Sequence, residues 1–546
     1  MSLFVLLLAA LWFRYRTTFH NFATQIPPKR HSSRGGDGQN IPPTFPYFFP
    51  ILGTLPLAYL WRPRDLVLSV NSFFQSPQQA IRVKILHQDF YLVRGADNIR
   101  ALFKAQVTNI PFVKFALSYA FGTPAKALTL YDQDDSGTNH APHPESTVLP
   151  HNRIDYLVHH STKTFLEGPG LTPLWNRYLK NITAQLHTLH DNLGSSEEWK
   201  FHHDLISLIS NETTIATLNA LCGPHLLRLN PNFINHFDRF DENLQTYMQG
   251  FPWFLAPRAY LARKRVLNAV KEWQQHARDH FTPSALDENG DDQYWGSSYF
   301  RLRHSMFLAM GEGNFDHASI ASSDFGFIWA MRNAITATSW TIYQIFRDPE
   351  LLNAIRAEVD ACSSGGRLEY DTDKLLRCCP VLSAVYAETL RLRTHFYFVR
   401  LGDRGNPLPI LSWIIPPRKP VVALTTVAHF DKEAWNVGGK GEYPLHVFWP
   451  GRFLKPGEKK GEAEFVTKGL EGSWIPYGGG SRMCPGRHFA KRQILVTAAL
   501  VVGMFDVEVV EDTVGENLTL MGFGSGVSRL VGRAGVKIRR RKREEY

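Results

Sequence analysis

Cysteine is scarce in this chain of 546 residues, which contains only Cys222, Cys362, Cys378, Cys379 and Cys484. An odd number of cysteines without regular spacing argues against the disulfide framework of a small secreted protein. No Cys-x-x-Cys pattern is present, so the spacing typical of a structural zinc site is missing. We therefore expect a reducing compartment, in which a special cysteine serves as a ligand or a nucleophile.

A strong excess of one charge is also absent. The chain has 60 Lys and Arg residues against 50 Asp and Glu residues, a formal net charge of +10. This excess is modest for the length; it fits an acidic partner or an anionic membrane surface and does not by itself indicate nucleic-acid binding. With 44% hydrophobic and 20% charged residues, the composition excludes a disordered or collagen-like chain.

The apolar run at the N-terminus is short. It covers only Leu3–Phe13, whereas a full membrane span needs ~20 apolar residues. A signal peptide is the alternative, but here the positive charges of Arg14 and Arg16 follow the run instead of preceding it. Positive charge in that place favours retention of the following chain in the cytoplasm. We expect residues 1–16 to form a membrane anchor, tilted or partly interfacial.

The segment after the anchor is basic and then rich in proline. It contains Lys29, Arg30 and Arg34, followed by IPPTFPYFFPILG at positions 41–53. Prolines at this density favour a stiff extended segment and exclude a helix. We interpret residues 17–50 as a linker and residues 51–546 as one catalytic body.

Hydrophobic periodicity predicts a mainly α body with a minor β-sheet and no second domain. Strands are expected at 81–85, 90–93, Val421–Thr425, Phe505–Val510 and Val536–Arg539. Helices are expected at Asp97–Lys104, Ile154–Leu166, Leu174–Leu193, His203–Leu221, Phe233–Tyr247, Pro257–Phe281, Phe325–Phe346, Pro349–Asp360, Pro380–Leu392 and Gly486–Val502.

The strongest local signal is the stretch Trp474-Ile-Pro-Tyr-Gly-Gly-Gly-Ser-Arg-Met-Cys484-Pro-Gly-Arg-His-Phe-Ala. Cys484 stands just before an apolar helix, where backbone N–H groups and the helix dipole favour a thiolate. Gly478 and Gly480 allow the backbone to pass close to a flat ligand, and Arg482 can neutralise a carboxylate on that ligand. The alternative is a glycine-rich turn with a buried thiol.

This stretch resembles the haem-binding signature of the cytochrome P450 superfamily, with Tyr477 in place of the usual Phe. A chance match in a chain of this length is on the order of 10⁻⁵. The resemblance implies the P450 fold and haem b, with Cys484 as the axial thiolate of the iron. It also implies that Tyr477, Gly478, Gly480, Arg482 and Gly486 surround the cofactor.

Other segments resemble the same family. Glu388-Thr-Leu-Arg391 resembles its Glu-x-x-Arg pair, and Phe448-Trp-Pro-Gly-Arg452-Phe resembles the segment whose arginine completes a structural triad. Arg400 lies where the family places a haem-propionate ligand; a surface arginine is the alternative. The family's Trp-x-x-x-Arg motif is missing between 151 and 180, where His159, His160 or Lys163 can substitute unless they form a solvated helix face.

The central helix departs from the family pattern. Most members carry Ala-Gly-x-Asp/Glu-Thr there, but this chain has Asn333 at the Thr position and no acid between Phe325 and Phe346. The segment resembles the sterol 7α-hydroxylase and prostacyclin synthase branch, which contains both monooxygenases and isomerases. We expect Asn333 to hold a proton-bearing water; the alternative is a satisfied buried amide.

The resemblance implies a fungal microsomal haem-thiolate monooxygenase. It would insert one oxygen atom from O2 into an apolar terpenoid, sterol, polyketide or alkaloid. Electrons would come from NADPH through NADPH-cytochrome P450 reductase, which Arg487, Lys491 and Arg492 would attract. The expected location is the endoplasmic reticulum membrane, with the catalytic body facing the cytoplasm. Substrate contacts are expected from 112–121, 251–255, 327–331, 395–399 and 521–527.

Two alternatives to this reading remain. One is a haem-thiolate isomerase or dehydratase that acts on a peroxide without NADPH. The other is a non-catalytic haem-binding protein. A turnover assay with reductase and NADPH separates the monooxygenase from both.

Overall fold

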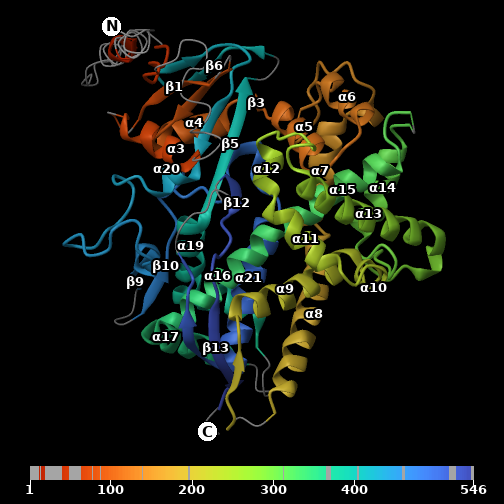
Figure 1. Ribbon diagram of the computed structural model, residues 1–546, viewed down its shortest axis with the longest axis vertical. Coiled ribbons are helices and arrows are strands. Elements are labelled where there is room, and N and C mark those ends of the chain that lie inside the picture. Colours follow the sequence, from red (N-terminus) through yellow and green to blue (C-terminus); the bar gives the residue numbers. More distant parts are fainter. Residues whose placement is uncertain are drawn as a thin grey trace.

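The computed structural model describes residues 12, 14–18, 40–47, 63–74, 76, 78–85, 88–137, 139–194, 197–311, 313–363, 370–402, 405–457, 462–515 and 524–542. Helices make up most of these residues, and a group of strands lies at one end of the molecule (Figure 1). The expected mainly α fold with a minor β-sheet is therefore confirmed.

The helices follow the predicted runs and add several short ones. They are α3 (Pro63–Ser72), α4 (Ala96–Lys104), α5 (Ile110–Tyr119), α6 (Ala125–Gln133), α7 (Ile154–Glu167), α8 (Leu171–Asn192), α9 (Leu205–Cys222), α10 (His225–Leu229), α11 (Phe233–Glu242), α12 (Leu244–Met248), α13 (Pro257–His280), α14 (Ser298–Leu308), α15 (His317–Ala330), α16 (Arg332–Arg347), α17 (Pro349–Asp360), α18 (Thr372–Cys378), α19 (Pro380–Arg393), α20 (Thr425–His429) and α21 (Arg487–Met504).

Aspartates cap four of these helices. The Asp204 carboxylate accepts from the backbone N–H of Ile206 and Ser207 at the start of α9. In the same way, α15, α17 and α18 are capped by Asp316, Asp348 and Asp371. Because such a cap satisfies N–H groups that have no partner within the helix, it fixes where the helix begins.

The strands form four small sheets. They are β1 (Ala80–Ile85), β2 (Gln88–Val93), β3 (Val107–Thr108), β4 (Lys200–His202), β5 (Thr394–Gly402), β6 (Leu408–Ile410), β7 (Trp413–Ile415), β8 (Val421–Leu424), β9 (Leu454–Pro456), β10 (Ala463–Phe465), β11 (Phe505–Asp512), β12 (Ser525–Val527) and β13 (Ala534–Arg540). The largest runs β1-β2-β8-β5-β12, with β3 also paired to β5. The long strand β5, absent from the sequence prediction, extends from this sheet toward α19 (Figure 1).

The core surrounds α16, which packs against α9, α19 and α21. Every residue of α16 from Ala334 to Phe346 is buried. A helix that is buried on all sides lies inside the molecule and not on its surface. The apolar helix α21 is likewise buried from Gln493 to Met504, so the helix that follows the cysteine loop is anchored in the core.

Two predicted helices are each divided in two, which corrects the sequence prediction. The run Phe325–Phe346 is interrupted at Met331, between α15 and α16. There the Met331 N–H donates to Ile328 O and the Ala334 N–H donates to Met331 O, a tighter spacing than that of an α-helix. The run Phe233–Tyr247 is divided in the same manner at Asn243.

Most of the expected anchor and linker lies outside the described residues. Among those that are described, no helix is long and apolar enough to cross a membrane. Near the end of the linker, the Phe45 N–H donates to Arg82 O and the Arg82 N–H donates to Pro43 O. This part of the segment therefore runs beside β1, with Phe45 buried.

Candidate functional site

The loop before α21 is closed by its own backbone. The Cys484 N–H donates to Tyr477 O at 2.9 Å, and the Met483 N–H donates to Gly480 O at 3.1 Å. The guanidinium of Arg487, the first residue of α21, donates to Cys484 O at 3.0 Å. Cys484 is thereby held at the entry of the helix, and its side chain is exposed.

Glycines in this loop are required by space as well as by conformation. Gly478 and Gly480 have φ of 73° and 70°, in the left-handed region that side chains disfavour. A Cβ atom on Gly480 would lie 1.8 Å from Phe103 O, and one on Gly479 would lie 2.3 Å from the Phe103 ring. The loop therefore approaches α4 closely, while its predicted close approach to a flat ligand stays a prediction.

The Cys484 thiol is subject to opposing influences. Although the residue keeps accessible surface, the surrounding protein desolvates its thiol and raises its pKa, while the backbone N–H of Gly486 and the charge of Arg487 lower it. Arg487 also forms an ion pair with Glu167 of α7, which reduces its effect. A metal ion bound to the sulfur would deprotonate this thiol.

Tyr477 has a partner that the family's usual Phe cannot use. Its hydroxyl lies 2.9 Å from the hydroxyl of Tyr386 on α19. Both rings are enclosed, and desolvation raises the pKa of each hydroxyl. The two neutral hydroxyls connect the cysteine loop to α19.

The structure brings Glu388, Arg391 and Arg452 together. The Glu388 carboxylate accepts from Arg391 at 2.6 and 2.9 Å and from Arg452 Nε at 3.2 Å. Arg391 also donates to the carbonyl oxygens of His429 and Leu445. All three charged side chains are buried, and a buried charge is tolerated only when it is paired and hydrogen-bonded, as it is here.

His429 is a site residue that sequence reasoning missed. Its Nδ1 lies 2.8 Å from Arg391 O, and its Nε2 accepts from the Ile475 N–H at 3.1 Å. Burial and the charge of Arg391 lower the pKa of His429 to about 3, so the ring is neutral and Nδ1 carries the hydrogen. His429 therefore connects the triad to the start of the cysteine loop; nothing in the sequence around it indicates this role.

Arg400 is a buried cation that pairs with no carboxylate of the described residues. It lies on β5, and its Nη1 donates to Val399 O at 3.0 Å. Burial, with a contribution from the charge of Arg482, lowers its pKa to about 10. Such a guanidinium is suited to an anionic group on a cofactor.

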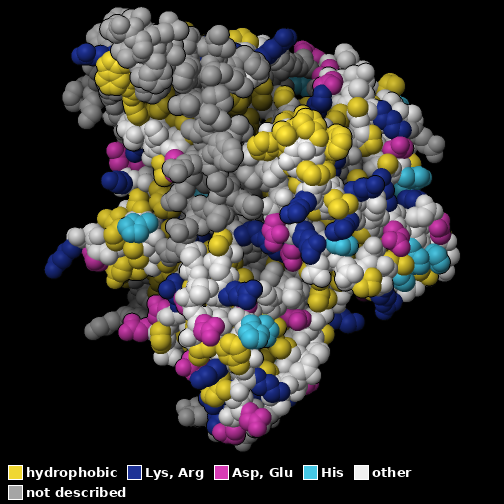
Figure 2. Space-filling view, in the orientation of Figure 1, with side chains coloured by type: hydrophobic (Ala, Val, Ile, Leu, Met, Phe, Trp, Pro, Cys, Tyr) yellow, Lys and Arg dark blue, Asp and Glu magenta, His cyan; other side chains and the backbone are white. Residues whose placement is uncertain are grey.

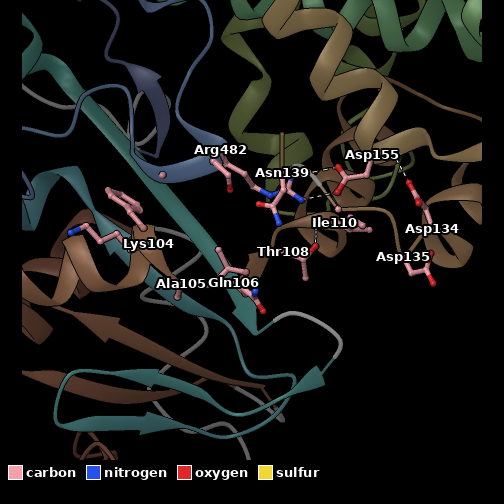
Figure 3. Close-up of a pocket in the computed structure, with 15 residues that line it drawn as sticks. Lys104, Ala105, Gln106, Thr108, Ile110, Asp134, Asp135, Asn139, Asp155 and Arg482 are labelled. Carbon is pink, nitrogen blue, oxygen red and sulfur yellow. Dashed lines mark hydrogen bonds and ion pairs between the residues drawn. The ribbon is translucent and has the colours of Figure 1, made fainter. Parts of the chain in front are cut away.

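Arg482 is paired within the chain. Its Nη2 lies 2.7 Å from Asp155 Oδ2 on α7, and the Asp155 N–H donates to Asp134 at 2.6 Å (Figure 3). A cavity of about 350 Å³ adjoins this pair and is lined in part by Lys104, Asn139 and Ser481. The structure pairs Arg482 with a protein carboxylate, and its predicted contact with a carboxylate of a ligand stays a prediction.

The structure gives different surroundings to the three residues that could replace the missing Trp-x-x-x-Arg motif, which are His159, His160 and Lys163. The ring of His159 donates to the Ser481 backbone carbonyl, and burial together with the charge of Arg482 lowers its pKa. His160 stacks on Tyr156, and Lys163 lies 3.8 Å from Glu167. Only His159 therefore contacts the cysteine loop.

Asn333 lies in the first turn of α16. Its Oδ1 accepts from the Val527 N–H at 2.8 Å. The amide thus attaches β12 to the central helix, in line with the satisfied-amide alternative. Its predicted role in holding a proton-bearing water stays a prediction.

The expected substrate segments are partly packed core. Phe121 contacts Phe240, Phe325 and Trp329, and Phe327 contacts Tyr299. The segment 251–255 is exposed at Trp253–Leu255. Residues 521–523 lie outside the described residues.

Comparison with known proteins settles the family. The family model described as Cytochrome P450 matches residues 162–529. This chain belongs to the cytochrome P450 family. It is 30% identical to the cytochrome P450 monooxygenase fsoE of Humicola fuscoatra, over 94% of this chain and 90% of that protein. It is 27% identical to the monooxygenase efuG of Hormonema carpetanum, over 92% and 91%.

The resemblance to the sterol 7α-hydroxylase branch is also confirmed. Cholesterol 7-alpha-monooxygenase of Cricetulus griseus is 28% identical over 52% of this chain and 54% of its own length. The family and its named relatives make this P450 an oxidoreductase of the monooxygenase class.

The residues present fit the haem that the family implies. The Cys484 thiol, a group that can act as a thiolate ligand, precedes a helix, and Arg400 is a buried cation with no carboxylate of the described residues paired to it. Cys484 would hold the iron, and Arg400 would bind an acidic group of the macrocycle.

Proposed function

We propose that this P450 inserts one oxygen atom from O2 into an apolar small molecule of fungal secondary metabolism, with electrons from NADPH delivered by a separate reductase. The observation that carries the proposal is the geometry of the cysteine loop. Cys484 is fixed at the N-terminus of α21 by hydrogen bonds of the loop and of Arg487. The names of the fungal relatives support the monooxygenase class.

The chain's own residues perform three tasks in this function. Thiolate-bound haem supplies the chemistry of oxygen activation. The triad and His429 hold the loop that presents Cys484, because their hydrogen bonds connect α19 to Ile475. Arg400 would hold an acidic group of the cofactor, and α16, which is buried from Ala334 to Phe346, would help to keep solvent out of the core.

The proposed substrate is a terpenoid, sterol, polyketide or alkaloid. Support comes from the aromatic side chains of Phe121, which follows α5, and of Phe325 and Trp329 on α15. Further support comes from a relative named for cholesterol oxidation. Apolar pockets with few polar groups select such molecules.

The proposed reductase surface surrounds the start of α21. Arg487, Lys491 and Arg492 lie within two turns of one helix, and Lys491 also lies 5.7 Å from the Phe465 ring centroid. A cluster of cations attracts an acidic partner and increases the rate of encounter at low salt.

The proposed location is the endoplasmic reticulum membrane, with the catalytic body facing the cytoplasm. Trp253, Phe254 and Leu255 lie in the turn between α12 and α13 and are 67%, 62% and 63% exposed. Figure 2 displays hydrophobic side chains gathered over the α5 and α12 region. Large exposed apolar patches favour insertion into a lipid interface.

The test is turnover of the full chain with a fungal reductase, in extracts of the native metabolite background. The proposal expects a product heavier by one oxygen atom that requires both NADPH and O2. Product formation without NADPH and O2 would support the isomerase alternative. Haem binding without any product or NADPH consumption would support a non-catalytic protein.

A further inference from the structure

Charged side chains from α11 surround the break in the central helix. Arg332, the first residue of α16, is 8% exposed, and its Nη2 lies 2.6 Å from Asp238 Oδ1. Its Nε lies 3.5 Å from Asp241 Oδ2. Asp241 is also buried; it accepts from Trp329 Nε1 at 2.9 Å and lies 3.5 Å from Arg529. α11 therefore presents two carboxylates to the residue directly before Asn333.

A small cavity lies inside this cluster. Asp241, Arg332, Asn333 and Thr336 are among the residues that line it. The space open to the centre of a water molecule is about 10 Å³, close to what one water requires. A cavity of this size with several polar neighbours suits a single ordered water.

Arg332 supplies an independent sign of a ligand. Its Nη1 is buried and has no hydrogen-bond partner among the described residues, and its Nε makes only the 3.5 Å ion-pair contact with Asp241. A buried N–H without an acceptor costs ~1–3 kcal/mol. A water in the cavity would accept from Arg332 and remove this cost.

We propose that the cavity holds one ordered water, and that Asp241 is the acidic member of this distal polar site. Most family members place an acid on the central helix, directly before the hydroxyl residue. In this chain Arg332 stands at that place, and the acid approaches from α11. Asp241 is a positioning residue: its carboxylate fixes Arg332 so that the guanidinium presents N–H groups to the water, next to Asn333 and Thr336.

This inference rests on the proposed monooxygenase function, since a monooxygenase must bring protons to the distal side of its cofactor. A merely structural role for the cluster, fastening α11 to α16, is the competing interpretation. The two interpretations make different predictions for variants of residues that line the cavity but take part in no ion pair.

The experiment compares three variants of the full-length, haem-loaded protein. Asp241→Asn removes the charge but keeps an acceptor for Trp329, and Thr336→Val removes a hydroxyl without touching an ion pair. Glu242→Gln is the matched control, because Glu242 is on the same helix, lies 3.8 Å from Arg529 and is half-exposed. The first readout is the infrared stretching band of carbon monoxide added to the reduced protein, which responds to hydrogen-bond donors nearby. The second is NADPH oxidation with a fungal reductase, measured in H2O and in D2O.

We expect Asp241→Asn and Thr336→Val to move the carbon monoxide band. We also expect them to slow NADPH oxidation about tenfold, equivalent to ~1.4 kcal/mol, with a larger ratio of rates in H2O and D2O. Glu242→Gln should match the wild type in both readouts.

An unchanged band and isotope ratio in both test variants would overturn the inference. The inference would also be overturned if Asp241→Asn lowered the melting temperature while Thr336→Val kept the wild-type carbon monoxide band and isotope ratio. That result would mean that the cluster has only a structural role. Failure of the proposed function would appear differently: the wild type would not oxidise NADPH, while the band comparison would still decide whether the water site exists.

Discussion

At the scale of single residues, the charges around the cysteine loop are balanced within the chain. Arg482 is matched by Asp155 and Arg487 by Glu167, so both arginines join the loop to α7. Arg400 alone among these three lacks an anion in the described part of the chain. We therefore propose that Arg400 binds the acidic groups of the cofactor. Arg482 is already held in place by its ion pair with Asp155.

Cys484→Ser is expected to abolish the thiolate signature of the haem. Serine keeps the size of the side chain and the loop hydrogen bonds, but its hydroxyl is not a thiolate ligand. The reduced, carbon monoxide-bound wild type should absorb at the red-shifted position peculiar to thiolate-bound haem, and the variant should not. Cys222→Ser, at a buried cysteine of α9, is the control for loss of a cysteine elsewhere. A variant that keeps the red-shifted band would exclude Cys484 as the ligand.

Asn333→Leu and Asn333→Asp separate two roles of this amide. Both the amide and a carboxylate can accept from the Val527 N–H, whereas leucine cannot. If attachment of β12 is the only role, Asn333→Asp should behave as wild type and Asn333→Leu should be less stable by ~1–3 kcal/mol. If the amide also holds a proton-bearing water, both variants should form less product per NADPH consumed and more peroxide. Unchanged coupling in both variants would limit Asn333 to packing.

The residues predicted from sequence were those whose motif is local. Cys484, Gly478 and Gly480 lie within one turn and its flanks, so their spacing alone indicates the loop. Asp155 could not be predicted, because its contact with Arg482 joins positions 327 residues apart. The same reason applies to Asp241, which becomes relevant only when α11 folds against α16.

At the scale of elements, the central helix and the strand β5 differ most from the sequence prediction. The apolar pattern continues through Met331, so periodicity gives no sign of the break between α15 and α16. β5 follows α19 directly, at Thr394 after Arg393, without a Gly or Pro to separate a helix from a strand. Its partners β8 and β12 are distant in sequence, so tertiary pairing decides its conformation.

His429 predicts how the connection between α19 and the cysteine loop responds to pH. Because the folded-state pKa of His429 is lowered to about 3, from an ordinary value near 6.5, its contribution to stability is present above pH 6.5. That contribution decreases as the pH falls from 6.5 toward 3, because the unfolded chain takes up a proton on His429 that the folded ring binds only near pH 3. His429→Gln lacks this titration but can still donate and accept, so its melting temperature should fall less steeply over that range.

His429→Phe provides the complementary test at neutral pH. It leaves the Arg391 carbonyl and the Ile475 N–H without these partners, which should destabilise the protein by ~1–3 kcal/mol for each group. The loss should appear in the melting temperature and in haem retention. If the melting temperatures of the wild type and His429→Gln changed in parallel with pH, that result would contradict the lowered pKa of His429.

At the scale of the whole molecule, the fold class and the haem loop were both accessible from sequence. Long amphipathic or apolar runs such as α13 and α21 determine helices by themselves. Short elements such as α10, α12 and β12 depend on neighbours, because isolated segments of that length are not stable. The arrangement of the region where α11, α16 and β12 meet is a property of packing and could not be predicted from any one segment.

The exposed turn between α12 and α13 leads to a prediction about membrane association. Deleting residues 1–16 should weaken binding of the protein to vesicles, and replacing Trp253, Phe254 and Leu255 with Ser in that background should reduce the remaining binding at least tenfold. The reason is that burying one such side chain in an apolar environment contributes ~1.5–3 kcal/mol, and ~1.4 kcal/mol corresponds to a factor of ten. The matched control replaces three exposed apolar residues elsewhere, Leu149, Leu302 and Val447. Flotation with anionic vesicles measures the bound fraction, and the carbon monoxide spectrum checks that haem is retained. Equal flotation of the test and control triple variants would mean that this turn does not enter the lipid, and the membrane contact would then have to lie on another face of the molecule.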